Sequence, residues 1–156
     1  DYAVFCEALH CVTTHLCKMI AGDGEGATKL IECIVNTAQN QTIAQIAAKS
    51  VICSSLVKAA MFGEDANWGR ILCALGYCGA DINVEKIDVV LASAAGEILV
   101  CKSGAGVEFS ETKAKKILQE KEISIRIQLN SGKASATAWG CDLTYDYVKI
   151  NGDYRT

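Results

Sequence analysis

The chain has 156 residues, of which 51% are hydrophobic and 21% are charged, and its net charge is −3. This length and composition suit one ordinary folded domain and exclude a disordered protein. With a negative net charge, the chain lacks the excess of basic residues that is typical of a nucleic-acid-binding protein. Its apolar runs are too short to span a bilayer. We therefore expect neither nucleic acid nor a membrane among the partners.

Nine cysteines and the absence of proline distinguish the composition. The odd number of cysteines and the lack of a CxxC pair argue against a complete disulfide framework. Most of them stand where a helix or strand favours a small apolar side chain, so we expect buried free thiols and a cytoplasmic location. The chain opens without an initiator methionine or a signal pattern, so we expect it to begin inside a longer polypeptide.

The first part of the chain alternates between helical and extended patterns. Residues 2–20 carry apolar side chains at helical spacing, and the glycine-rich stretch at 21–26 ends that helix. Residues 29–37 alternate and are rich in β-branched side chains, which predicts a strand. A second helix is predicted over residues 42–53, while residues 56–62 are short and ambiguous.

The second part adds both element types. A helix is expected from Trp68 to Leu75, with Trp68 buried and either Asp65 or Asn67 as its cap. The other predicted elements are strands at 87–92 and 97–101 around a Ser-Ala-Ala-Gly turn, a helix from Ser110 to Lys121, and strands at 123–129 and 134–141. This order indicates an α/β (α+β) fold with a mixed, mostly antiparallel sheet and packed helices.

The glycine cluster at residues 22–27 matches the loose GxGxxG/A pattern of dinucleotide-binding loops. That pattern needs a strand before it and a helix after it, so that helix amides face the phosphates. Here the predicted order is reversed, and the carboxylates of Asp23 and Glu25 would repel phosphate. On the residues alone, we interpret the segment as a turn with solvated carboxylates.

The helix-spaced pairs Cys6/His10 and Cys11/His15 have the spacing of metal ligands on one helix face. The two pairs are offset by five residues, roughly 140° around a helix, so their four side chains cannot converge. No second cluster supplies further ligands. We therefore expect core thiols beside partly exposed histidines and no metal.

The other candidates for chemistry lack partners. Glu25 and the series Asp142, Asp146 and Asp153 supply carboxylates, but spacing alone gives them no geometry. The aromatic side chains lack the basic stripe of a nucleic-acid platform and are interpreted as core and interface residues, namely Trp68, Trp139, Tyr145, Tyr147 and Tyr154. These observations indicate a cytosolic α/β domain and no particular reaction.

Three stretches closely resemble the ornithine acetyltransferase (glutamate N-acetyltransferase) family. They are DGEGATK at residues 23–29, GEDANWGR at 63–70, and ATAWGCDLTYDYVKINGDYRT at 136–156. The stretches are ungapped and occur in the family's order. The resemblance implies the fold of these enzymes and of the related N-terminal-nucleophile-like aminopeptidases. It also implies that residues 1–28 complete the catalytic core and that residues 29–156 form the C-terminal α/β domain of the β chain.

The resemblance implies a precursor that cleaves itself before a threonine, which then becomes the nucleophile. In this family, arginine biosynthesis uses that threonine to carry an acetyl group from N2-acetylornithine to glutamate. The nucleophile lies upstream of residue 1 in the family pattern, so no residue of this chain, including Thr13, Thr14 and Thr28, is expected to be catalytic. The fragment alone is expected to be inactive. The implied partner is the α chain of the same precursor, in an α2β2 assembly.

Three substrate-binding positions of the family fall on this chain, at Glu25, Asn151 and Thr156. Glu25 would offer a carboxylate to an ammonium group of an amino-acid substrate, and Asn151 can both donate and accept. Thr156 adds a hydroxyl and the terminal carboxylate. The tail is rich in apolar residues, so we expect it to dock against the body. The family usually has alanine at the position of Gly152.

The resemblance implies no cofactor, and it leaves open whether acetyl-coenzyme A serves as a co-substrate. One alternative belongs to a different class of function. In it, this region is a non-catalytic binding or assembly part of a related self-cleaving N-terminal-nucleophile aminopeptidase or amidase. The two hypotheses separate on acetyl transfer, because the alternative predicts amidase activity without it.

Overall fold

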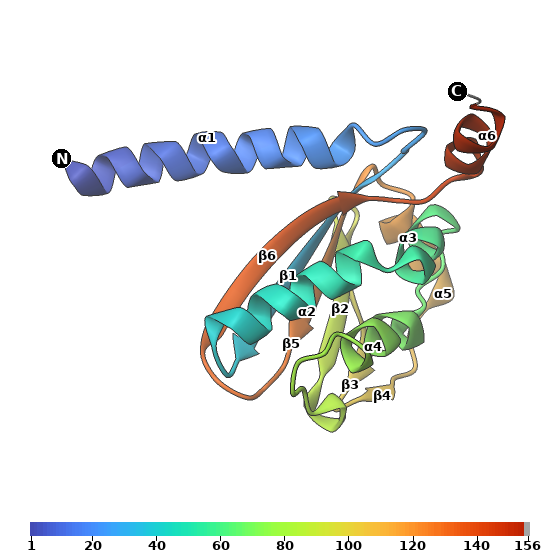
Figure 1. The fold of residues 1–156 in the computed structure, drawn as a ribbon. Coiled ribbons are helices and arrows are strands. Elements are labelled where there is room, and N and C mark those ends of the chain that lie inside the picture. The colour runs from blue at the N-terminus through green and yellow to red at the C-terminus, as the bar shows by residue number, and fades with distance from the viewer. Residues whose placement is uncertain (155–156) are drawn as a thin grey trace.

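The computed structural model describes residues 1–154, and its centre is a six-stranded sheet with the strand order β4-β3-β2-β5-β1-β6 (Figure 1). Of the neighbouring pairs, β1 and β5 are parallel and the others are antiparallel. The strands are β1 (Leu30–Ala38), β2 (Asp88–Ser93), β3 (Gly96–Lys102), β4 (Ala105–Gly106), β5 (Glu122–Gln128) and β6 (Ala134–Cys141). The expected mixed, mostly antiparallel sheet is confirmed.

The helices of the body begin at the polar residues that the sequence offers as caps. Asn67 accepts the amide hydrogen of Arg70, so Asn67 and not Asp65 caps its helix. Asn40, Ser54 and Ser110 cap the other three in the same way. The helices are α1 (Tyr2–Gly22), α2 (Gln41–Cys53), α3 (Ser55–Phe62), α4 (Trp68–Gly76), the 3-10 turn η1 (Val84–Lys86), α5 (Glu111–Leu118) and α6 (Tyr145–Asp153).

The core lies between one face of the sheet and helices α2 to α5. β1 and β5 bury alternate residues on that face, from Ile31 to Val35 and from Ile123 to Ile127. Each such aliphatic side chain contributes roughly 1.5–3 kcal/mol when it leaves water. Trp68 is only partly buried, which corrects the expectation of full burial, because its ring packs at the edge of the core against Gly106 of β4.

The turn at residues 130–133 does not make β5 and β6 neighbours, because β1 lies between them. The amide of Asn130 donates to the Thr37 hydroxyl at 2.8 Å, and the amide of Gly132 donates to the Thr37 carbonyl at 2.9 Å. Asn130 and Thr37 have φ values of 50° and 54°, and a Cβ at Gly132 would collide with the Ala38 carbonyl. This junction carries the chain past the end of β1.

Helix α1 extends away from the sheet and buries none of its residues (Figure 1). Its half-buried positions include Thr14 and Lys18, on the side that faces the sheet. Val12 and Leu16 each precede one of these by two residues, about 200° around the helix. Seven large apolar side chains, which we call the α1 stripe, are therefore exposed on the other side: Tyr2, Phe5, Leu9, Val12, Leu16, Met19 and Ile20.

The cysteines are less buried than their sequence contexts indicated. All nine are free thiols, and Cys33 and Cys101 are the two that are buried. Burial raises the pKa of both thiols above the ordinary value. The expectation of core thiols on α1 is wrong for Cys6 and Cys11, because that helix packs against nothing along most of its length.

Among residues 1–154, no single helix is long and apolar enough to cross a bilayer. Helices α2 and α3 together reach the necessary length and composition, but they are bent by 57°. Both helices bury side chains in the core, including Ala47, Val51 and Val57.

Asp88, at the start of β2, joins three segments of the chain. Its carboxylate accepts hydrogen bonds from Lys102 Nζ at 2.8 Å, Ser103 N at 2.9 Å and Asn130 Nδ2 at 3.2 Å. Burial by itself raises the pKa of Asp88, but these bonds together lower it below its ordinary value. The stability that results is present above the carboxyl's pKa in the unfolded chain, and it is lost as the pH falls through the lower folded pKa.

We expect Asp88→Asn to lower the free energy of unfolding at pH 7 by about 1–2 kcal/mol, since a charged acceptor with three donors is lost. The difference from the parent protein should start to shrink as the pH falls below about 4, the ordinary pKa of an aspartate in the unfolded chain, and should vanish below the lower pKa of folded Asp88. Urea unfolding measured across this pH range tests the prediction. Asp81→Asn, at an exposed loop position, is the control. A difference independent of pH would contradict the assigned cause.

Candidate functional site

Two of the three expected substrate-binding residues meet in the structure although they are 126 positions apart. Asn151 Nδ2 donates a hydrogen bond to Glu25 Oε2 at 2.8 Å. Glu25 lies in the turn between α1 and β1, Asn151 lies in α6, and both side chains are exposed. The turn and α6 lie together beyond one end of the sheet (Figure 1). The third residue, Thr156, lies outside the described residues.

The amide of Asn151 has a determined orientation. Its nitrogen also donates to the Tyr147 carbonyl at 2.9 Å, so it is bonded to two acceptors. An amide oxygen could not replace it there, because oxygen would face a carboxylate and a carbonyl. The two N–H groups of Asn151 are therefore used, whereas its carbonyl oxygen accepts no hydrogen bond from residues 1–154 and remains for a ligand. Together with the Glu25 carboxylate, it offers acceptors only, which suits an ammonium group.

The turn that carries Glu25 packs directly against the start of α6. Gly26 has a φ of 65°, and a Cβ there would lie 2.9 Å from Asp146 Cβ and 3.0 Å from Tyr147 N. Ala27 N closes the turn onto the Gly24 carbonyl at 2.9 Å. Helix α1 precedes this turn and β1 follows it, so the predicted reversal of the dinucleotide-loop order is confirmed.

Asp142 binds the end of the same turn through its side chain. Its side chain is 3% exposed and accepts hydrogen bonds from Thr28 N at 2.8 Å, Lys29 N at 3.1 Å and the Thr28 hydroxyl. Two residues further on, the Thr144 hydroxyl donates to the Gly26 carbonyl at 2.7 Å. Thr144 is also the N-cap of α6. One short segment thus holds both the turn and the first residue of the helix.

Lys29 is buried at the point where the turn enters β1. Its ammonium donates to the carbonyls of Met61 at 2.8 Å and Leu118 at 2.7 Å, at the ends of α3 and α5. Burial lowers the pKa of Lys29, while the carboxylates of Glu64 and Asp142 oppose that change. The side chain therefore ties the end of the turn to two helices of the body.

These supporting residues were not found from the sequence. Asp142 was one of three unplaced carboxylates, and the structure distinguishes it because Asp146 and Asp153 are exposed. Thr144 had a recognisable signal, a hydroxyl residue directly before the helical tail. Asp142 had none, since its partner Thr28 is 114 positions away.

The tail is attached differently from what its composition suggested. Helix α6 buries no residue, so the expectation that its apolar side chains dock against the body is wrong for residues 145–154. One aromatic contact joins it to the body, where the rings of Tyr145 and Phe62 meet edge to face at 5.4 Å. The helix is held instead by hydrogen bonds at Thr144 and Asn151.

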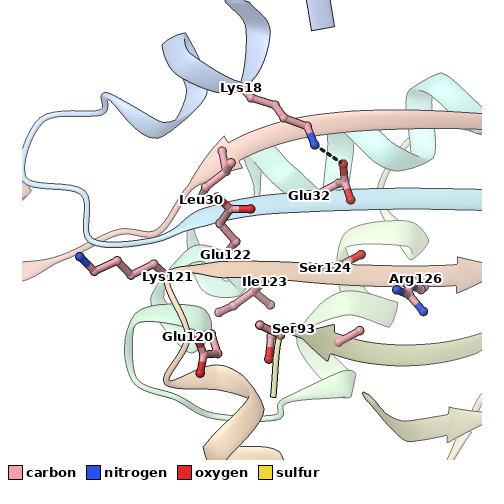
Figure 2. Close-up of a pocket in the computed structure, with 12 residues that line it drawn as sticks. Lys18, Leu30, Glu32, Ser93, Glu120, Lys121, Glu122, Ile123, Ser124 and Arg126 are labelled. Carbon is pink, nitrogen blue, oxygen red and sulfur yellow. Dashed lines mark ion pairs between the residues drawn. The ribbon is translucent and has the colours of Figure 1, made fainter. Parts of the chain in front are cut away.

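A separate pocket of about 450 Å³ lies between α1 and the uncovered face of the sheet (Figure 2). Pockets are common binding sites, but three of the six charged residues that line this one are engaged in ion pairs. Glu32 pairs with Lys18 at 3.3 Å and accepts from Trp139 Nε1 at 2.8 Å, and Arg126 pairs with Glu97 at 2.9 Å. Within residues 1–154, no group of three or more His, Cys, Asp or Glu could hold a metal ion. We therefore assign the candidate site to Glu25 and Asn151.

We expect Gly26→Ala to lower the free energy of unfolding by about 1–3 kcal/mol, because a side chain is strained at positive φ and collides with α6. Thermal unfolding, together with proteolysis of the released tail, measures the effect. The matched control is Gly152→Ala within α6, where a Cβ has nothing within 4 Å. That substitution should stabilise the helix by about 0.5–1 kcal/mol. Equal effects of the two substitutions would exclude a specific role for the turn.

Comparisons with known proteins agree with the resemblance seen in the sequence. The chain is 57% identical over 156 residues to the arginine biosynthesis bifunctional protein ArgJ 1 of Clostridium acetobutylicum, covering 100% of this chain and 38% of that protein. It is 54% identical to the ArgJ protein of Caldanaerobacter subterraneus subsp. tengcongensis, covering 100% of this chain and 39% of that protein. The chain thus spans about two fifths of the length of these relatives.

A solved structure extends the agreement to the fold. The crystal structure of the arginine biosynthesis bifunctional protein ArgJ from Bacillus halodurans matches with a TM-score of 0.92 and 46% identity, covering 99% of this chain and 71% of that one. The family model described as ArgJ family matches residues 1–156. The chain therefore belongs to the ArgJ family.

Proposed function

We propose that this protein supplies the substrate-binding part of an ornithine acetyltransferase, which moves an acetyl group from N2-acetylornithine to glutamate in arginine biosynthesis. Membership of the ArgJ family and the names of its relatives support the pathway. The observation that carries the proposal is the 2.8 Å hydrogen bond between Asn151 and Glu25. It brings two residues that match family binding positions into one acceptor pair.

The proposed reaction passes through an acetylated threonine that lies upstream of residue 1. The threonine hydroxyl attacks the acetyl carbon of N2-acetylornithine, and its proton goes to the departing α-nitrogen of ornithine. The amino group of glutamate then attacks the threonine ester, takes the acetyl group and returns a proton to the threonine oxygen. This transfer needs no cofactor, because the acetyl group moves between two amino acids. Because the proposed nucleophile lies outside the 156-residue chain, the chain alone is proposed to be inactive.

Glu25 and Asn151 are proposed to bind the side-chain ammonium of N2-acetylornithine. The α-nitrogen of that substrate is acetylated, so its side chain carries its one ammonium group. A carboxylate and an amide oxygen side by side match this group by charge and by hydrogen bonding. The pair would act at a distance from the acetyl carbon and align the substrate. Thr156, which also matches a family position, is proposed to complete the site.

We propose a cytoplasmic location and acetyl transfer in preference to amide hydrolysis. All nine cysteines are free, which supports a reducing compartment. The names of the relatives concern arginine biosynthesis and do not favour the amidase alternative. An assay of the complete protein separates the two reactions, since amide hydrolysis without acetylglutamate formation would contradict the proposal. The same assay with acetyl-coenzyme A determines whether it is a second donor.

We expect Glu25→Ala in the complete protein to raise the KM for N2-acetylornithine about tenfold or more, because a charge-assisted bond is lost. The kcat should change little, since the bond exists both before and during acetyl transfer. Steady-state kinetics with a check of self-cleavage provides the test. Glu108→Ala, at an exposed position before α5, is the control. An unchanged KM would return Glu25 to the solvated-turn interpretation.

We also propose that the α1 stripe packs against the α chain of the same precursor, within an α2β2 assembly. A 21-residue helix with no buried residue gains little from packing within this chain, although most helical stability in proteins comes from packing of an apolar side. Its seven large apolar side chains face away from the sheet and need a cover. The part of the relatives that lies outside this match, about three fifths of their length, is long enough to provide that cover. The division after residue 28 stays a prediction.

We expect the double substitution Leu9→Lys and Leu16→Lys to prevent assembly of the complete protein, because two charges enter the middle of the α1 stripe. Analytical ultracentrifugation should then show smaller particles than those of the parent protein. His15→Lys places a charge on the same helix outside the stripe and should assemble normally. Normal assembly of the double variant would show that the stripe is not the contact.

A further inference from the structure

We propose that Asp142 is a positioning residue that holds Glu25 and Asn151 in register with each other. The inference rests on the proposed function, because it concerns the same ammonium-binding pair. Asp142 is buried and would act through the two chain segments that carry the pair. Three sets of contacts support this role.

The first set connects Asp142 with Glu25. Both amides at the end of the turn, those of Thr28 and Lys29, donate to the same oxygen of the Asp142 carboxylate, at 2.8 Å and 3.1 Å. The Thr28 hydroxyl donates to the other oxygen. Three donors from two adjacent residues determine both the position and the orientation of that backbone. Glu25 is three residues away in a turn that Ala27 closes, so its position follows from theirs.

The second set connects Asp142 with Asn151. Thr144 follows Asp142 by two residues, donates to the Gly26 carbonyl at 2.7 Å and caps α6. The helix then runs without interruption from Tyr145 to Asp153, so its first residue determines where Asn151 lies. The segment anchored by Asp142 therefore determines the start of the helix.

The third set of contacts fixes Asp142 relative to the turn. A carboxylate that is 3% exposed is tolerated only while its donors stay in place. Its own amide donates to the Lys29 carbonyl at 3.2 Å, while the Lys29 amide donates to its carboxylate, so the two segments are joined by bonds in both directions. The Lys29 ammonium, itself buried, supplies the opposite charge nearby. Moving the turn relative to the segment before α6 would break all of these contacts together.

A positioning role gives a kinetic signature that a purely structural role does not give. If Asp142 acts through Glu25 and Asn151, its removal should weaken substrate binding by a smaller factor when Glu25 is already absent than when Glu25 is present. If Asp142 only supports folding, its removal should reduce the amount of active protein and leave the KM of the remaining molecules unchanged. The two roles therefore separate in a double-mutant cycle.

The experiment measures kcat and KM for N2-acetylornithine in the complete protein, with active enzyme counted from the burst of ornithine release. We expect Asp142→Ala to raise the KM about tenfold, as a misplacement on the order of 1 Å would. Asp142→Asn keeps an oxygen for both amides, and its KM should stay within about twofold of the parent value. In the Glu25→Ala background, Asp142→Ala should raise the KM by clearly less than it does in the parent protein, because only the part that acts through Asn151 is left. Asp81→Ala, at an exposed loop carboxylate, is the matched control.

Two results would overturn the proposal. One is a KM of the double variant equal to the product of the two single effects, and the other is an unchanged KM in Asp142→Ala. If Asp142→Ala does not fold, Thr28→Ala replaces it, because it removes one of the three donors at an exposed residue. Its KM should rise about twofold to threefold, with a smaller rise in the Glu25→Ala background. The proposed function fails separately, namely if Glu25→Ala itself leaves the KM unchanged.

Discussion

Two buried side chains of opposite charge, Lys29 and Asp142, hold the chain at its entry into β1. Lys29 donates to carbonyl groups of α3 and α5, and Asp142 accepts two backbone amides and a hydroxyl from the turn before the strand. Buried charges are stable only with such partners, so the arrangement permits one path into the sheet. The register of β1 and the position of Glu25 both depend on it.

The place of β1 in the sheet explains why the candidate site forms. β1 and β6 are antiparallel neighbours, and Leu30 at the start of one pairs with Cys141 at the end of the other. The turn before β1 and the helix after β6 must therefore lie at the same end of the sheet. Glu25 and Asn151, which are 126 positions apart, meet for this reason. Strand order brings the two segments of the site together, and the polar contacts between them then determine the positions of Glu25 and Asn151.

The ends of the described chain follow a different principle from its body. Helices α2 to α5 bury their apolar sides against the sheet, whereas α1 and α6 bury none of their residues. Sequence patterns cannot distinguish a helix that packs within its own chain from one that packs against another segment, since both require an apolar side. That limit explains the wrong expectations for Cys6, Cys11 and the apolar residues of the tail.

The sequence by itself determined most of the elements, because their signals are local, but it left α3 ambiguous and did not predict α6. The alternation from Ile123 to Leu129 marks a strand, and Ser110 caps the helix that follows it within three residues. The three family motifs also identified Glu25 and Asn151 as candidates. Only the tertiary structure decided that β1 separates β5 from β6, that these two side chains touch, and that Asp142 is buried against the turn that carries Glu25. Such contacts join residues about ninety or more positions apart, and the free energy that selects them comes from packing and charge burial, which no local pattern records.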